Sequence, residues 1–181
     1  MILPRGHHAG GRRYTFPALV QPQGLKQLIA QSLRSVGSAV GNSNLRADRL
    51  ILTGHSGGGA AVLSILRHTD PDEFHLFDGL YNDPANLIRW VLARLGCERA
   101  GCDRPPGSLR VLFRAGEGTA VNSRRVHAAI EAQLSREPRS APALRRRCRV
   151  EPVSTPHNGI PREFGWRLLA DPASEITARH R

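Results

Sequence analysis

The chain has 181 residues, of which 40% are hydrophobic, and its formal net charge is +11. This length suits a single domain, the hydrophobic share excludes a disordered chain, and no apolar run reaches the roughly 18 residues of a membrane-spanning helix. The positive charge comes from arginines spread over the whole chain, and only 5% of the residues are aromatic, so the composition disfavours a nucleic-acid-binding surface.

The predicted elements begin with an irregular segment and one helix. Residues 1–24 are rich in Gly, Pro and Arg and are expected to be irregular, apart from a strand stub at Ile2-Leu3. Apolar residues at helical spacing then predict a helix over residues 25–36, and Gly37 is expected to end it.

The rest of the chain alternates short apolar runs with helical patterns, which is typical of a parallel sheet flanked by helices. The expected elements are, in chain order, a strand at residues 49–53, a helix at 60–66, a strand at 74–77, a helix at 85–95, a loop at 96–108, a strand at 109–113, a helix at 123–134 capped by Ser123, a connection at 135–147, a strand at 148–153 and a helix from Pro161 onward. Residues 172–181 are expected to be a frayed tail. Because no linker interrupts this order, the sequence predicts one α/β domain over residues 1–181.

One strand-to-helix turn carries a motif with chemical meaning. Gly54-His55-Ser56-Gly57-Gly58 fits G-x-S-x-G, the nucleophile elbow, and it stands between a predicted strand and a predicted helix. Glycines two positions either side of the serine remove side chains that would collide with the strand and the helix. Ser56 is thereby expected above the sheet edge at the positive end of the helix, where the Gly57 N–H points toward a developing oxyanion.

With this context the chain resembles the α/β-hydrolase superfamily of serine hydrolases over residues 2–169. The resemblance rests on the strand–elbow–helix unit, two further strand–helix units and a histidine after the last strand. It implies a triad in the chain order serine, acid, histidine, with each member at the carboxyl end of a strand. His157 occupies the histidine position and is expected to be the general base, the alternative being a loop histidine that caps the last helix. His55 is expected to pack or to shape the pocket.

The acid of the triad is open between two main carboxylates. Asp78 ends the strand after the elbow helix, whereas Glu117 follows the next strand, with Thr119 where many family members have an aspartate. Asp78 could instead form a turn with the next residue, and Glu117 could pair with Arg124 or Arg125. The sequence favours Asp78 over Glu117. The candidates, in this order, are Asp78, Glu117 and Asp83.

The function that the resemblance implies is hydrolysis of a carboxylic ester, thioester or amide of a small acyl substrate, through an acyl-enzyme on Ser56. In the family, a second oxyanion donor comes from a loop after an earlier strand, and here only Ile2-Leu3 is left to form such a strand. The sequence therefore predicts a sheet that lacks some N-terminal strands. It leaves two alternatives: a catalytically inactive hydrolase-like binding protein or fragment, and an arginine-rich protein associated with nucleic acid.

No cofactor or metal is expected. His7-His8 has no further ligand at suitable spacing, and the cysteines at 97, 102 and 148 contain no C-x-x-C pair that would indicate zinc. Cys97 and Cys102 could form a small disulfide in an oxidising compartment or remain reduced. The start of the chain lacks the apolar core of a signal peptide, which favours the cytoplasm but leaves the location open.

Overall fold

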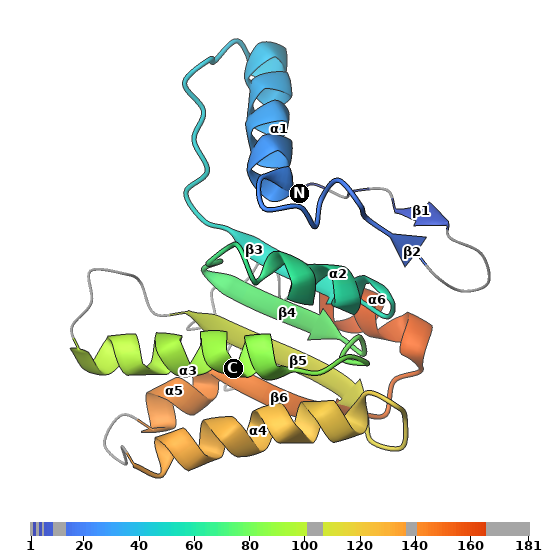
Figure 1. Cartoon of the computed structure of the whole chain (residues 1–181), viewed down its shortest axis with the longest axis vertical. Coiled ribbons are helices and arrows are strands. Elements are labelled where there is room, and N and C mark those ends of the chain that lie inside the picture. Colours follow the sequence, from blue (N-terminus) through green and yellow to red (C-terminus); the bar gives the residue numbers. More distant parts are fainter. Residues whose placement is uncertain are drawn as a thin grey trace, which may run out of the picture.

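The computed structural model describes Ile2, Pro4 and residues 6–8, 14–100, 107–136 and 141–165. Its centre is an all-parallel sheet of four strands in the order β3-β4-β5-β6, with helices flanking it (Figure 1). The strands are β3 (Ile51–His55), β4 (Glu73–Phe77), β5 (Ser108–Arg114) and β6 (Cys148–Val153). The predicted α/β architecture with a parallel sheet is confirmed, and the strand boundaries lie close to those expected from the sequence.

Each strand pairs with the strand that follows it in the chain, so sheet order equals chain order. Gly54 lies beside Leu76, Leu76 beside Val111, and Val111 beside Val150. Right-handed crossovers that advance in one direction place their helices on one face of the sheet. The helices of the crossovers are α2 (Gly58–Ile65), α3 (Ala85–Ala100), α4 (Ala120–Leu134) and α5 (Ala141–Arg147). Figure 1 shows α3 and α4 side by side in front of the sheet.

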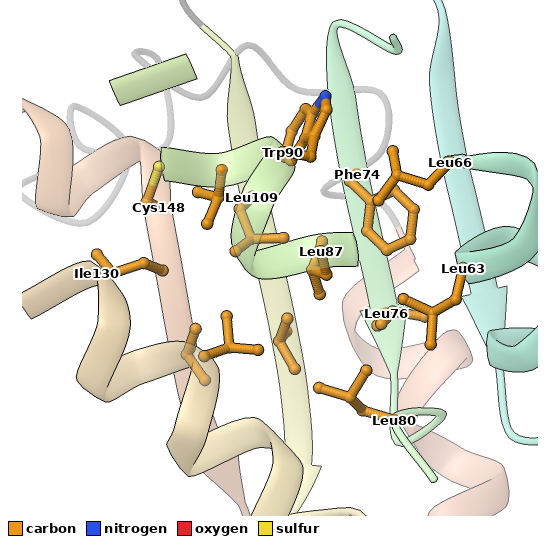
Figure 2. Packing of buried hydrophobic residues seen from close by; sticks show 14 of the residues in the cluster. Leu63, Leu66, Phe74, Leu76, Leu80, Leu87, Trp90, Leu109, Ile130 and Cys148 are labelled. Atoms are coloured by element: carbon orange, nitrogen blue, oxygen red, sulfur yellow. The ribbon is translucent and has the colours of Figure 1, made fainter. Parts of the chain in front are cut away.

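The sheet face beneath these helices carries the main hydrophobic core (Figure 2). Leu76 of β4 and Leu109 of β5 point from the sheet toward Leu63 of α2, Leu87 of α3 and Ile130 of α4. Burying a side chain of this size contributes about 1.5–3 kcal/mol, before the conformational entropy that folding costs. The core therefore holds the four strands together, and with them the turns at their carboxyl ends.

The opposite face of the sheet is polar at one end and apolar at the other. Near the start of β4 the buried Glu73 carboxylate pairs with Arg49, and it accepts from His75 Nε2–H at 2.7 Å. At the carboxyl ends a small apolar cluster joins β4 and β5 to α6 (Ile160–Phe164), and its buried members are Phe77, Leu112 and Ile160. Helix α6 therefore ties the segment after β6 to the sheet edge where the motif lies.

The start of the chain differs from the prediction. Ile2 is not in a strand, and Leu3, the other half of the expected stub, lies outside the described residues. A short antiparallel pair forms instead between β1 (His7–His8) and β2 (Tyr14–Thr15), inside the segment that was expected to be irregular.

Helix α1 (Gly24–Val40) extends beyond its predicted end, so the prediction that Gly37 stops the helix is wrong. Gly41 ends it, because its φ of 69° is a left-handed conformation that glycine adopts without strain, and its N–H donates to the Gly37 carbonyl. Gly37 is needed for a different reason: a Cβ there would lie 2.5 Å from the Asn42 carbonyl oxygen, where the chain turns back over the helix.

Two later boundaries also differ. Helix α3 continues through Gly96 to Ala100, so the prediction of a loop is wrong for residues 96–100, and residues 101–106 lie outside the described part. Helix α4 begins at Ala120, and Ser123 lies inside it rather than at its cap. The Ser123 hydroxyl donates to the Thr119 carbonyl at 2.8 Å, a bond that a serine makes within a helix.

Helix α5 stands where a connection was predicted over residues 135–147. Leu144 is buried in the main core, and Arg145 pairs with Glu131 of α4 at 2.7 Å. The last helix has Pro161 in its first turn, as predicted. Its continuation and the expected tail lie outside the described residues, as does a Cys97–Cys102 disulfide. None of the helices in the described ranges combines the length and apolar character needed to cross a membrane.

Candidate active site

The turn that ends β3 holds Ser56 in an uncommon backbone conformation. Its φ is 53°, and among the described non-glycine residues only Asp78, with a φ of 46°, also has a positive value. Such a conformation costs on the order of 1–3 kcal/mol and persists only where the surroundings hold it. The Ser56 N–H donates to the Phe77 carbonyl at 3.1 Å, and the Ser56 carbonyl accepts from the Gly59 N–H at 3.0 Å. These bonds fix a sharp turn from strand to helix.

Two glycines near this turn are required by close packing, and one of them is not a motif glycine. A Cβ on Gly54 would lie 2.9 Å from Val62 Cγ2 of α2, as expected for a strand glycine beneath a helix. A Cβ on Gly58 would meet nothing within 4 Å, so the prediction that Gly58 removes a collision is wrong. Gly59 has that role, because its Cβ would overlap the carbonyl group of Gly79 and lie 2.6 Å from the carbonyl carbon. The turns after β3 and β4 are therefore in backbone contact.

Helix α2 begins immediately after the serine. Gly57 occupies its N-cap position and is exposed. N–H groups in the first turn of a helix have no partner within the helix, and the helix dipole adds a partial positive charge there. The Gly57 N–H is thus placed where it could donate to an anionic group beside Ser56.

Asp78 follows β4, and only 2% of its side chain is exposed. Its Oδ1 accepts from the Thr119 hydroxyl and, at 3.4 Å, from the Arg114 N–H, while its Oδ2 accepts from His157 Nδ1–H at 2.7 Å. The Asp78 N–H donates to the Leu112 carbonyl at 2.7 Å and so anchors the turn to β5. Both carboxylate oxygens are therefore hydrogen-bonded, as a buried carboxylate requires.

These hydrogen bonds decide the charge of Asp78 and the tautomer of His157. Burial raises the pKa of Asp78, but hydrogen bonds from Thr119, His157 and the Arg114 N–H lower it by more, so the pKa lies below its ordinary value. The carboxylate is ionised at neutral pH and can only accept a hydrogen bond. A neutral His157 must then carry its proton on Nδ1, which leaves the Nε2 lone pair to accept another proton.

His157 begins a 3₁₀ turn (His157–Gly159) after β6, and 28% of its side chain is exposed. His55 reaches it from the end of β3: the His55 Nε2–H donates to the His157 carbonyl at 3.1 Å, and the ring centroids lie 4.6 Å apart. Burial lowers the pKa of His55 by more than its bond to that carbonyl raises it, so His55 is neutral at neutral pH. His55 therefore packs against the candidate base, which is the kind of role expected for it.

The structure brings Ser56, Asp78 and His157 to the same edge of the sheet, but it leaves Glu117 apart from them. The Glu117 side chain is 50% exposed and accepts from Arg114 Nη1 at 2.8 Å. A solvent-exposed pair of this kind contributes at most about 1 kcal/mol. Of the two carboxylates that the sequence left open, Asp78 is the one that contacts the histidine.

The arginines that were expected beside Glu117 have other partners. Arg124 Nη2–H donates to the Ala115 carbonyl at 3.2 Å. Arg125 pairs at 3.2 Å with Asp83, the third candidate acid, which is exposed. Asp83 is therefore engaged on the surface of α4 and is not beside His157.

Two residues at the site were not predicted from the sequence. Thr119 holds Asp78 through its hydroxyl, and the available signal was its position where many members of the resembling family have an aspartate. Tyr81 lies in the loop after β4, where burial and the negative charge of Asp78 raise its pKa, and no motif marked it. Both residues lie in turns that follow buried strands, where polar side chains converge.

No family model matches this chain, and neither a curated protein nor a solved structure matches it. Within the described ranges, no three residues among His, Cys, Asp and Glu are grouped so that they could hold a metal ion. A proposal for the function therefore rests on the geometry of this chain's own residues.

Proposed function

We propose that this chain is a serine hydrolase of the α/β-hydrolase type that cleaves carboxylic esters, thioesters or amides of small acyl substrates. The observation that carries the proposal is the 2.7 Å hydrogen bond between buried Asp78 and His157, beside the left-handed turn at Ser56. Serine, acid and histidine in this chain order, at the carboxyl ends of parallel strands, are the arrangement that such enzymes use.

In the first half of the reaction Ser56 Oγ attacks the carbonyl carbon of the substrate, and its proton passes to His157 Nε2. The ionised Asp78 holds the imidazole in the Nδ1–H tautomer and stabilises the imidazolium that forms. The carbonyl oxygen becomes negatively charged and accepts a hydrogen bond from the Gly57 N–H. The bond to the leaving group then breaks, the leaving group takes the proton from Nε2, and the acyl group remains on Ser56.

In the second half water attacks the acyl-enzyme and gives its proton to His157 Nε2. The bond between the acyl carbon and Oγ breaks, the proton returns to Oγ, and the carboxylic acid leaves. His157 therefore acts first as base and then as acid in each half, without a net change in its charge.

The test is covalent labelling with a fluorophosphonate probe, followed by intact-mass measurement and circular dichroism on the same sample. One adduct is expected on the wild type and none on Ser56→Ala. The matched control is Ser64→Ala, which removes a serine within α2 and is expected to label like the wild type.

A second candidate function is that of a catalytically inactive hydrolase-like binding protein. It is favoured by one observation: β3 is an edge strand in the described part of the sheet, so no earlier strand there delivers a second backbone donor to Ser56. A folded wild type that takes no adduct would contradict the hydrolase and leave this candidate, which ligand-induced shifts in melting temperature would then test.

A further inference from the structure

The histidine of the site comes from the edge of the sheet that lies farthest from the serine. His157 follows β6 and Ser56 follows β3, and these two strands end the described order β3-β4-β5-β6. Neighbouring strands lie about 4.8 Å apart, so the three spacings between the two edges amount to roughly 14 Å. The segment after β6 must therefore cross the ends of β5 and β4 before its histidine can approach Ser56.

Two contacts hold this segment over the middle strands. The buried Ile160 packs in the apolar cluster at the carboxyl ends of β4 and β5. The carboxylate of Asp78, in the turn after β4, accepts from His157 Nδ1–H at 2.7 Å. Because neither contact reaches β3, they do not by themselves fix His157 relative to Ser56.

His55, the last residue of β3 and the neighbour of Ser56 in the chain, makes a third contact. Its Nε2–H donates to the main-chain carbonyl of His157 at 3.1 Å, and the two rings lie 4.6 Å apart at an angle of 34°. A carbonyl oxygen only accepts, so a neutral His55 carries its proton on Nε2. His157 is thus held at its side chain from the β4 turn and at its main chain from β3.

His55 suits this place because it is uncharged. Burial lowers the pKa of His55 by more than the bond to the His157 carbonyl raises it. In the proposed reaction His157 becomes an imidazolium in each half, and a neutral ring beside it does not repel that charge. A lysine or arginine could also donate to the carbonyl, but it would place a permanent positive charge next to the imidazolium.

We propose that His55 is a positioning residue of this site, whose hydrogen bond to the His157 carbonyl sets the imidazole against Ser56. The inference rests on the proposed serine hydrolase function. His55 and Ser56 are consecutive residues at one strand end, so the group that holds the base and the nucleophile keep a fixed relation to each other. His55 does not touch the substrate, and it exchanges no proton during the reaction.

The experiment separates the hydrogen bond of His55 from its ring. His55→Phe keeps an aromatic ring but removes the donor, whereas His55→Gln loses the ring but keeps an amide N–H close to the place of Nε2. His68→Phe is the matched control, because His68 is exposed and lies beyond the far end of α2. The rate of labelling by the fluorophosphonate, kcat and KM for p-nitrophenyl acetate, and the melting temperature are measured for each variant.

His55→Phe is expected to lower kcat and the labelling rate about 10-fold, since a displacement of about 1 Å can cost 10²-fold and the remaining contacts limit the shift of His157. KM should stay near the wild-type value, and the melting temperature should fall by only about 2–4 °C, as for the loss of one ordinary hydrogen bond in a chain of this size. His55→Gln should recover most of both rates, and His68→Phe should match the wild type.

Proton nuclear magnetic resonance adds a measurement that does not depend on turnover. The His157 Nδ1–H that bonds to Asp78 should give a far-downfield signal. We expect this signal to broaden in His55→Phe, because the imidazole is less firmly held, and to remain sharp in His55→Gln and His68→Phe.

Several results would overturn the inference while a labelled wild type keeps the hydrolase. Equal losses in His55→Phe and His55→Gln would show that the hydrogen bond is not the cause, and wild-type rates in His55→Phe would show that the base needs no such contact. A loss confined to KM or to the melting temperature would assign His55 to binding or to structure. A folded wild type that takes no label would remove the proposed function itself, and with it the role of His55.

Discussion

The turns that end β3 and β4 share an unusual backbone conformation but are held by different forces. Ser56 and Asp78 both have a positive φ, yet Ser56 is fixed by backbone hydrogen bonds and a glycine contact, whereas the side chain of Asp78 is tied by three hydrogen bonds. In the proposed reaction this leaves the serine side chain to react, while the aspartate side chain holds the histidine. Under that proposal the turn after β3 presents the nucleophile and the turn after β4 orients the base.

The largest effect is expected when Asp78 is replaced, and almost none when the other candidate acid, Glu117, is replaced. Asp78→Asn places an amide N–H or carbonyl against His157 Nδ1, so the imidazole loses its fixed tautomer, and kcat/KM for an ester should fall on the order of 10⁴-fold. Glu117→Gln removes only an exposed pair with Arg114 and should stay within about twofold of wild type. An equal loss of kcat/KM in both variants would show that Asp78 is not the acid that orients His157.

The contact between the two turns can be broken from the β3 side. Gly59→Ala inserts a methyl group into the Gly79 carbonyl and should destabilise the protein by about 2 kcal/mol, within the usual range for overpacking. Gly58→Ala is the matched control, because its added Cβ meets nothing and alanine favours a helix. It should be neutral or stabilise by up to about 1 kcal/mol. Urea unfolding of the two variants measures the difference.

The strain in each turn can be released separately. Ser56→Gly removes a side chain from a left-handed backbone and should raise the free energy of unfolding by about 1 kcal/mol, while abolishing labelling. Asp78→Gly releases the same strain but leaves Thr119 and His157 without their acceptor, so it should lower stability by about 1–3 kcal/mol. A melting temperature that rises in Ser56→Gly and falls in Asp78→Gly would support this difference between the two turns. Changes of the same sign in both variants would contradict it.

The smallest effect is a pH dependence of stability that belongs to the β4 turn alone. The pKa of Asp78 is lower in the folded chain than its ordinary value of 3.8, so the unfolded chain binds more protons between the two values. The stabilisation from Asp78 is therefore complete above about pH 4 and is lost as the pH falls through the folded pKa. Asp78→Asn should flatten the acid limb of the stability curve relative to wild type, whereas Ser56→Gly should leave its shape unchanged.

The strands were predictable because buried parallel strands are short apolar runs bounded by turn residues. Helix α5 was missed because its arginine run hides a pattern of only seven residues, and its support comes from distant contacts such as Arg145 with Glu131. The sequence placed the close contact at Gly58, but the structure places it at Gly59. The path of the neighbouring turn decides which glycine lies against the Gly79 carbonyl, and the motif does not specify that path.

The candidate site was predictable in its serine and histidine, because each stands in a recognisable context of strand, turn and helix. For the acid the sequence favoured Asp78 but left Glu117 open, because both follow buried strands. What separates them is the start of α4, which places Thr119 over Asp78 and leaves Glu117 in solvent. The path of the loop after β4 depends on Asn122 of α4, which donates to the Leu80, Tyr81 and Asn82 carbonyls, and no local pattern encodes these contacts.

The sequential strand order has a consequence for how the chain matures. The β3–β4 pair joins segments close in sequence, so the nucleophile turn and the acid turn can meet early, during synthesis or on refolding. His157 is 79 residues beyond Asp78, and it takes its place only after β5 and β6 have been added at the far side of the sheet. We therefore expect catalytic competence to be the last property that the folding chain acquires, with labelling of Ser56 lagging behind the recovery of far-ultraviolet circular dichroism.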